Sequence, residues 1–185
     1  MYNGMPSPTV RLGLPLLASM IVRLGASAHG RLDDLARARG IVLPNRPGEV
    51  ASEVPVALWR APFEWLVVTQ QGAQHAQLLH LMQQLVADET ALVIDSSDGS
   101  SVIELSGAAA TAVLARGCAL DFATWPERGG YCVPAGCARI PVLVHRLAPA
   151  RFWVHVDRSL EHYLWTWLHE VASDFEDPFM NDSIR

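Results

Sequence analysis

Residues 56–69 read VALWRAPFEWLVVT, two apolar runs of strand length on either side of one short connection. Residues 56–60 and 65–69 are rich in Val, Leu and Trp, and such β-branched and aromatic side chains favour strands. The connection, Ala61-Pro62-Phe63-Glu64, contains a proline, whose fixed φ suits a turn. This segment therefore predicts a β-hairpin.

An amphipathic helix is predicted directly after this hairpin. Apolar residues recur there at i, i+3, i+4, i+7 and i+8, which places them on one helix face. They are Leu78, Leu81, Met82, Leu85 and Val86. Before the hairpin, residues 10–17 and 20–24 are strand candidates, residues 28–39 a helix that Gly40 ends, and residues 43–55 a Pro-rich loop.

The second half of the chain gives similar signals. Residues 92–95 and 101–105 are predicted strands on either side of the turn Ser96-Ser97-Asp98-Gly99. An Ala-rich helix is expected from Gly107 to Gly117, followed by a loop rich in Gly and Pro.

A second hairpin, residues 139–146 and 152–156, leads to the last helix. Ser159 is expected to cap this helix, with Glu161 in its first turn facing the positive end of the helix dipole. The predicted apolar stripe consists of Leu160, Tyr163, Leu164, Trp167, Leu168 and Val171.

The order strand, glycine, helix, loop, hairpin, helix occurs twice along the chain. Gly25 corresponds to Gly107, and Trp65 corresponds to Trp153 at the start of the second hairpin strand. We therefore predict an α+β protein with two pseudo-repeated β-α-β-β-α lobes, whose sheets pack with the helices outside. Both tryptophans are expected to be buried in a shared core.

The predicted lobes set the domain limits. They cover about residues 20–95 and 101–172 and together form one domain, residues 20–172. Residues 1–19 are expected to be an N-terminal tail with one strand, and residues 173–185 a C-terminal tail.

Composition and charge exclude several classes of protein. With 50% hydrophobic and 18% charged residues, the chain is not intrinsically disordered. The net charge of −5 and the lack of a Lys/Arg cluster argue against a nucleic-acid partner. Three irregularly spaced cysteines indicate reduced thiols and a cytoplasmic protein.

Residues 12–22 imitate a secretory leader, because they are apolar and precede Ala26-Ser27-Ala28, a sequence similar to a cleavage site. Arg23 interrupts this pattern before the cleavage site, and Pro15 breaks the apolar run. The run is also shorter than the about 20 residues that cross a bilayer. We expect a buried strand here and no membrane segment.

No histidine or cysteine pattern predicts a metal site. His162 and His169 are two helical turns apart, too far to share one ion. Cys132, Cys137 and His145 provide one close pair of ligands where a tetrahedral site needs two.

Catalytic and cofactor signals are equally weak. Cys118 follows a helix C-terminus, where the dipole disfavours a thiolate. Asp95, Asp98 and Glu104 surround a turn, and turn Asp residues normally bind their own backbone. No glycine-rich phosphate loop follows a strand. We predict no catalytic, cofactor-binding or metal-binding residue in this chain.

The last helix offers a candidate partner interface. If Leu164 and Trp167 face the core, Trp165 points roughly 160° away from Trp167 on that helix. Trp is enriched in protein–protein interfaces, so Trp165 is the candidate interface residue. The alternative is that the helix is enclosed within its own domain.

Four segments, in the same order, resemble the gamma subunit of heterotetrameric sarcosine oxidase. They are ALWRAPFEWLV at 57–67, VIDSSDG with VIELSG at 93–99 and 102–107, LARGCALD at 114–121, and YLWTWL at 163–168. The resemblance covers about residues 20–172. Two departures are Phe63 at the hairpin tip and the Gly-rich segment 125–136.

The resemblance implies a fold similar to that of folate-binding aminomethyltransferases. It also implies a non-catalytic structural subunit of a sarcosine-oxidase-like flavoenzyme complex, which demethylates sarcosine to glycine and passes the one-carbon unit to tetrahydrofolate. The implied partners are larger alpha and beta subunits, and the implied cofactors (FAD, FMN, NAD, tetrahydrofolate and zinc) are on partner subunits.

The alternative is a stand-alone folate-binding aminomethyltransferase-like protein. Such a protein needs a pterin pocket with a carboxylate, for which Glu64 beside Trp65, or Asp95, is the candidate.

Overall fold

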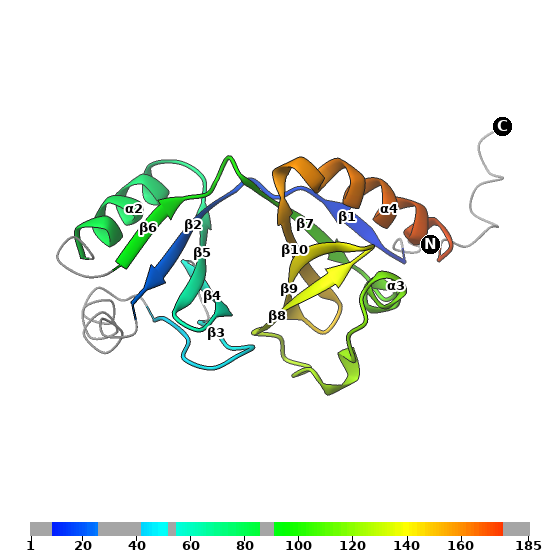
Figure 1. The fold of residues 1–185 in the computed structure, drawn as a ribbon. Coiled ribbons are helices and arrows are strands. Elements are labelled where there is room, and N and C mark those ends of the chain that lie inside the picture. The colour runs from blue at the N-terminus through cyan, green and yellow to red at the C-terminus, as the bar shows by residue number, and fades with distance from the viewer. Residues whose placement is uncertain (1–8, 26–41, 52–54, 86–90, 176–185) are drawn as a thin grey trace, which may run out of the picture.

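Two five-stranded antiparallel sheets form the centre of the protein (Figure 1). The computed structural model describes residues 9–25, 42–51, 55–85 and 91–175. The first sheet has the strand order β3 (Val50–Ala51), β4 (Val56–Ala61), β5 (Glu64–Gln70), β2 (Leu17–Leu24) and β6 (Ala91–Asp95). The second has the order β8 (Tyr131–Cys137), β9 (Ile140–Ala148), β10 (Arg151–Asp157), β7 (Ser100–Ser106) and β1 (Arg11–Gly13).

Helices cover the outer faces of both sheets. Helix α2 (Ala73–Leu85) packs on the first sheet, where Met82 joins Trp65 and Met20 in a buried cluster. Helices α3 (Ala110–Gly117) and α4 (Glu161–Ser173) pack on the second sheet (Figure 1). Two short 3-10 turns, η1 (Phe122–Thr124) and η2 (Arg158–Leu160), complete the described elements.

The chain passes between the sheets twice at the same end of the molecule (Figure 1). Strand β1 pairs with β7 in the second sheet, although β2, the next strand along the chain, lies in the first. Strands β6 and β7 likewise belong to different sheets, so the predicted turn at 96–99 links the two lobes and does not form a hairpin.

The inner faces of the sheets share a third buried cluster. It joins Val56, Leu58, Leu66 and Val68 of the first sheet to Val102, Cys132, Leu143 and Trp153 of the second. Burial of this apolar surface, at about 25 cal/mol per Å², holds the two sheets together.

Trp65 and Trp153 are both buried, 1% and 9% exposed, as expected. The expectation of one shared core is wrong, however. Trp65 faces α2, whereas Trp153 belongs to the cluster between the sheets. Successive strand residues point to opposite faces of a sheet. Phe152, the residue before Trp153, therefore points to the helix side of the second sheet, as Trp65 does in the first.

Both predicted hairpins and the helices after residues 72 and 107 are confirmed. The loop expected after Gly117 instead contains β8, because an edge strand tolerates Pro134, which has no N–H to donate. The loop expected at 43–55 contains β3. Some predicted features lie outside the described residues. They are the helix at 28–39, Val86 of the apolar stripe, and residues 1–8 and 176–185 of the tails.

Asp157, and not Ser159, caps the start of the last helical segment. Its carboxylate accepts hydrogen bonds from the backbone N–H and the hydroxyl of Ser159, at 2.9 and 2.5 Å. These bonds hold the pKa of Asp157 below its usual value. Glu161 lies in the first turn of α4, as predicted.

In the described part of the chain, every helix is too short or too polar to cross a bilayer.

Candidate functional site

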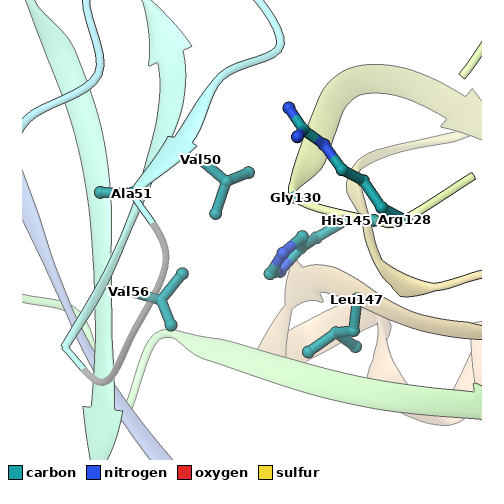
Figure 2. Close-up of a pocket in the computed structure, with 8 residues that line it drawn as sticks. Val50, Ala51, Val56, Arg128, Gly130, His145 and Leu147 are labelled. Carbon is teal, nitrogen blue, oxygen red and sulfur yellow. The ribbon is translucent and has the colours of Figure 1, made fainter. Parts of the chain in front are cut away.

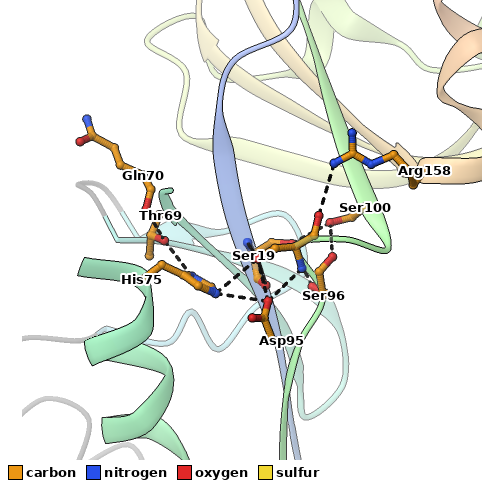
Figure 3. A network of polar contacts seen from close by, with 9 residues as sticks. Ser19, Thr69, Gln70, His75, Asp95, Ser96, Ser100 and Arg158 are labelled. Atoms are coloured by element: carbon orange, nitrogen blue, oxygen red, sulfur yellow. Dashed lines mark hydrogen bonds and ion pairs between the residues drawn. The ribbon is translucent and has the colours of Figure 1, made fainter. Parts of the chain in front are cut away.

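A polar network lies where the chain crosses between the sheets (Figure 3). His75, at the start of α2, is 6% exposed. Its Nδ1 lies 2.9 Å from Oγ1 of Thr69, and its Nε2 lies 3.2 Å from Oδ1 of Asp95. Ser97 donates its hydroxyl to the same carboxylate oxygen at 2.7 Å and its backbone N–H at 3.0 Å. The bonds from Ser97, with His75 adding to them, hold the pKa of Asp95 below its usual value.

A serine cluster continues this network into the second sheet. The hydroxyl of Ser19 on β2 lies 2.9 Å from that of Ser96 and 2.7 Å from that of Ser100, the first residue of β7. Arg158 donates to the carbonyl of Ser97 at 3.4 Å (Figure 3). The network therefore ties both crossover segments to one another and to η2.

The hydrogen-bonded row Thr69–His75–Asp95 has the hydroxyl, imidazole and carboxylate of a catalytic triad, but its hydroxyl is not accessible to a substrate. Thr69 is 1% exposed and donates its hydroxyl to the carbonyl of Gln70 at 3.1 Å. A nucleophile must reach a substrate atom, and this hydroxyl lies inside the protein. The row is a structural brace.

The carboxylates considered from sequence lie at separate places. Glu64 accepts hydrogen bonds from Arg23 and forms an ion pair with Arg60 at 3.1 Å. It lies opposite Arg23 on β2, whereas Asp95 lies opposite Met20, about 10 Å along the strand. Both carboxylates already have partners within the chain, so neither is an open anchor for a pterin.

The other acidic residues near the turn are also separate. Glu104 binds the guanidinium of Arg151 at 2.9 Å and the indole N–H of Trp153 at 2.8 Å. These bonds outweigh the cost of burial, and the pKa of Glu104 stays below its usual value. Asp98 is exposed at the turn.

An open groove of about 600 Å³ lies between the inner faces of the two sheets (Figure 2). No sequence pattern predicts this groove. Its lining includes Val50, Ala51, Val56, Arg128, His145 and Leu147. His145 projects from β9 toward the valines of the first sheet, and Arg128 extends along the rim (Figure 2).

His145 is 3% exposed, and its Nδ1 has no hydrogen-bond partner within the described residues. The centroid of its ring lies 5.8 Å from that of Trp153, with the two planes nearly perpendicular, and 6.4 Å from that of His155, with the two planes nearly parallel. Burial lowers the pKa of His145 to about 4. Burial and, to a smaller extent, repulsion from His145 lower the pKa of His155 to about 3. Both imidazoles are therefore neutral near pH 7.

The three cysteines are buried thiols. Cys132 lies opposite His145 on the inner side of β8, while Cys137 belongs to the helix-side cluster and lies across a β-bridge from Cys118. Residues five apart on a strand point to opposite faces, so Cys132 and Cys137 cannot bind one ion together. Among the residues the structure describes, no group of three metal-binding side chains converges.

Trp165 is partly buried and packs against the core of the second sheet, and so does Trp167. The buried stripe of α4 consists of Leu164, Leu168 and Ala172 and passes between the two rings. We expected Trp167 to face the core and Trp165 to point away from it. This expectation is wrong, because both rings pack partly against the core. Each tryptophan flanks the stripe with part of its surface open.

Residues 26–174 match the family described as "Sarcosine oxidase, gamma subunit family". The sarcosine oxidase subunit gamma of Corynebacterium sp. (strain P-1) is 31% identical over 180 residues, which cover 95% of this chain and 86% of that protein. The subunit of the same name from Arthrobacter sp is 32% identical over 159 residues, covering 83% and 74%.

Two solved structures are similar to this chain. A chain of the heterotetrameric sarcosine oxidase from Corynebacterium sp. U-96 in complex with pyrrole 2-carboxylate aligns with a TM-score of 0.82 and 27% identity, over 92% of this chain and 88% of that one. The glycine cleavage system aminomethyltransferase T from Bartonella henselae aligns with a TM-score of 0.61 and 14% identity, over 86% and 45%. The second match concerns the fold alone, and it agrees with the aminomethyltransferase-like fold expected from sequence.

Proposed function

Because the chain belongs to the sarcosine oxidase gamma subunit family, we propose that it is a non-catalytic structural subunit of a sarcosine-oxidase-like flavoenzyme complex. The observation that carries this proposal is the similarity along the whole chain, with 95% of its length aligned to a gamma subunit. The shared fold with a chain of a heterotetrameric oxidase supports it.

The chemistry is proposed to reside in larger alpha and beta partner subunits, which carry FAD, FMN, NAD, tetrahydrofolate and zinc. In support, the acid–base groups of the crossover network and the Glu64 cluster are engaged within the chain itself. The overall reaction is the oxidative demethylation of sarcosine, with transfer of the one-carbon unit to tetrahydrofolate. The complex is proposed to be cytoplasmic, in keeping with three reduced thiols.

The two lobes are proposed to be a pseudo-repeat within one domain. The expected limits, residues 20–172 with tails at 1–19 and 173–185, are too narrow at the N-terminus, because β1 (Arg11–Gly13) and the start of β2 at Leu17 are strands of the two sheets. In support of the pseudo-repeat, the sheet orders β3-β4-β5-β2-β6 and β8-β9-β10-β7-β1 match strand for strand. Helix α2 follows β5 as α4 follows β10. At the last position β1 of the second sheet takes the place of β6 of the first, which interleaves the lobes.

Trp165 is the proposed partner contact. Its ring is fixed on one flank of α4 by the core beneath it and keeps part of its surface open. A rigid, partly desolvated aromatic is the kind of residue that dominates binding energy at an interface.

Deletion of the gene in its native host tests the structural role. We expect the larger subunits to lose solubility or assembly, and sarcosine oxidation to fall with them. Complementation with the wild-type chain and with a Thr69→Ala, His75→Ala, Asp95→Ala series separates structure from catalysis. Each variant that still folds is expected to restore activity fully, whereas a folded, assembled and inactive variant would contradict the non-catalytic assignment.

A further inference from the structure

The groove between the sheets has features that a purely structural subunit does not need. One wall consists of Val50, Ala51 and Val56, and Leu147 lies on the other side. Its volume, about 600 Å³, is within the range of small-molecule sites, and such sites combine apolar walls with a few placed polar groups.

The first polar group is His145. Its side chain is almost entirely buried and points into the groove (Figure 2), and its Nδ1 has no partner among the described residues. A buried polar atom without a partner costs free energy, and a ligand that supplies the missing hydrogen bond recovers that cost. Because this imidazole is neutral, it suits an uncharged hydroxyl or amide.

The second polar group is Arg128 on the rim. The backbone N–H of Gly129 donates to the carbonyl of Pro126 at 3.1 Å, and that of Gly130 donates to the carbonyl of Arg146 at 2.8 Å. Gly129 also packs so closely on Leu147 that a Cβ there would lie 2.2 Å from the Leu147 carbonyl oxygen. These contacts hold the turn that carries Arg128, whose guanidinium favours paired hydrogen bonds to a carboxylate.

We propose that this groove binds a small amphipathic organic acid. Its carboxylate pairs with Arg128, its apolar body lies between Val56 and Leu147, and its hydroxyl or amide group hydrogen-bonds the imidazole of His145. The residues of this site are distinct from Trp165, the proposed partner contact on α4.

Titration calorimetry of the full-length chain with 4-hydroxybenzoate and with benzoate tests the site. We expect saturable 1:1 binding of 4-hydroxybenzoate and at least fivefold weaker binding of benzoate, which lacks the hydroxyl group. Arg128→Gln should weaken both probes at least tenfold, while Arg11→Gln, the same change on β1 at the far edge of the second sheet, should leave both affinities unchanged.

His145→Phe should bind the two probes equally, because the ring volume remains and the hydrogen bond is lost. If His145→Phe does not fold, the Arg128→Gln and benzoate comparisons still decide the matter. Absence of saturation by both probes up to about 10 mM, or affinities that Arg128→Gln leaves intact, would overturn the proposal.

Discussion

The indole of Trp167 on α4 lies against Gly117, the last residue of α3. A Cβ placed on Gly117 would lie 2.4 Å from Cη2 of Trp167, closer than such contacts allow. The missing side chain at this position therefore sets how near the two helices approach on the second sheet.

Gly117→Ala is expected to destabilise the protein by about 1–3 kcal/mol, the usual cost of overpacking. Shrinking the opposing ring with Trp167→Leu should recover part of the loss in the double variant. Urea denaturation measures both. Gly136→Ala is the matched control, because a Cβ there meets nothing within 4 Å, and its midpoint should hardly move. Equal midpoints for Gly117→Ala and the control would contradict the contact.

Trp65→Ala and Trp153→Ala are each expected to cost about 3–5 kcal/mol, as for other large buried aromatics. Each indole also donates a hydrogen bond, Trp65 to the carbonyl of Pro44 at 2.7 Å and Trp153 to Glu104 at 2.8 Å. The Phe variants should lose less, because they keep most of the packing. An unchanged denaturation midpoint for either Ala variant would mean that this tryptophan is not part of a core.

Thr69→Val keeps the shape of the side chain but leaves Nδ1 of His75 without its partner. We expect a loss of about 1–3 kcal/mol and full retention of assembly with partner subunits, because the network is a brace. Thermal denaturation and gel filtration measure the two effects. A Thr69→Val chain of normal stability would show that the brace contributes nothing.

Stability should fall as the pH drops from about 6.5, the usual histidine pKa, toward 4. The folded pKa values of His145 and His155 are lowered to about 4 and about 3, so the unfolded chain binds protons that the folded chain does not. The stabilisation is complete above the unfolded pKa and is lost as the pH falls through this window.

Each histidine contributes a slope of at most about 1.4 kcal/mol per pH unit. Denaturant titrations at pH 7, 6 and 5 should show His155→Leu with about half the wild-type slope. The window lies mostly above the range in which Asp95, Glu104 and Asp157, with lowered pKa values, add losses of the same sign. A wild-type chain equally stable at pH 7 and pH 5 would contradict two neutral buried imidazoles.

Local patterns predicted the hairpins and helices because their period is visible over ten or more residues. The helix at Leu78 and Met82 and the strand pairs around Pro62 and Pro149 belong to this group. Strand β8 is not predicted from sequence, because Pro134 and Gly136 are typical of loops. Within a sheet, an edge strand such as β8 tolerates them.

Tertiary relationships were not visible in the sequence. Strand β1 belongs to the second sheet because it pairs with β7. In that sheet Phe152, one residue before Trp153, faces the helices, so Trp153 faces the other sheet, whereas Trp65 faces a helix. The sequence indicates His145 only as a weak candidate metal ligand. Its burial and its place in the groove arise from cross-strand packing with Trp153 and from the opposing sheet.

Trp165→Ala is expected to weaken the complex with the larger subunits by about 2 kcal/mol or more if its ring is an interface anchor, with little change in the stability of the isolated chain. Trp167→Ala should mainly destabilise the chain, because its ring packs on α3. Affinity capture and urea denaturation of both variants separate the two effects. If Trp165→Ala unfolds the isolated chain instead, the helix is enclosed within its own domain and the contact lies elsewhere.

Native mass spectrometry of the tagged wild-type chain, purified from its native host, tests whether this chain is a subunit of an oxidase complex. We expect one heteromeric assembly of fixed stoichiometry, in which this chain accompanies larger, flavin-containing subunits with sarcosine oxidase activity. If the larger subunits form an active complex that lacks this chain, while the chain is recovered only alone or with copies of itself, the assignment as a structural subunit is wrong.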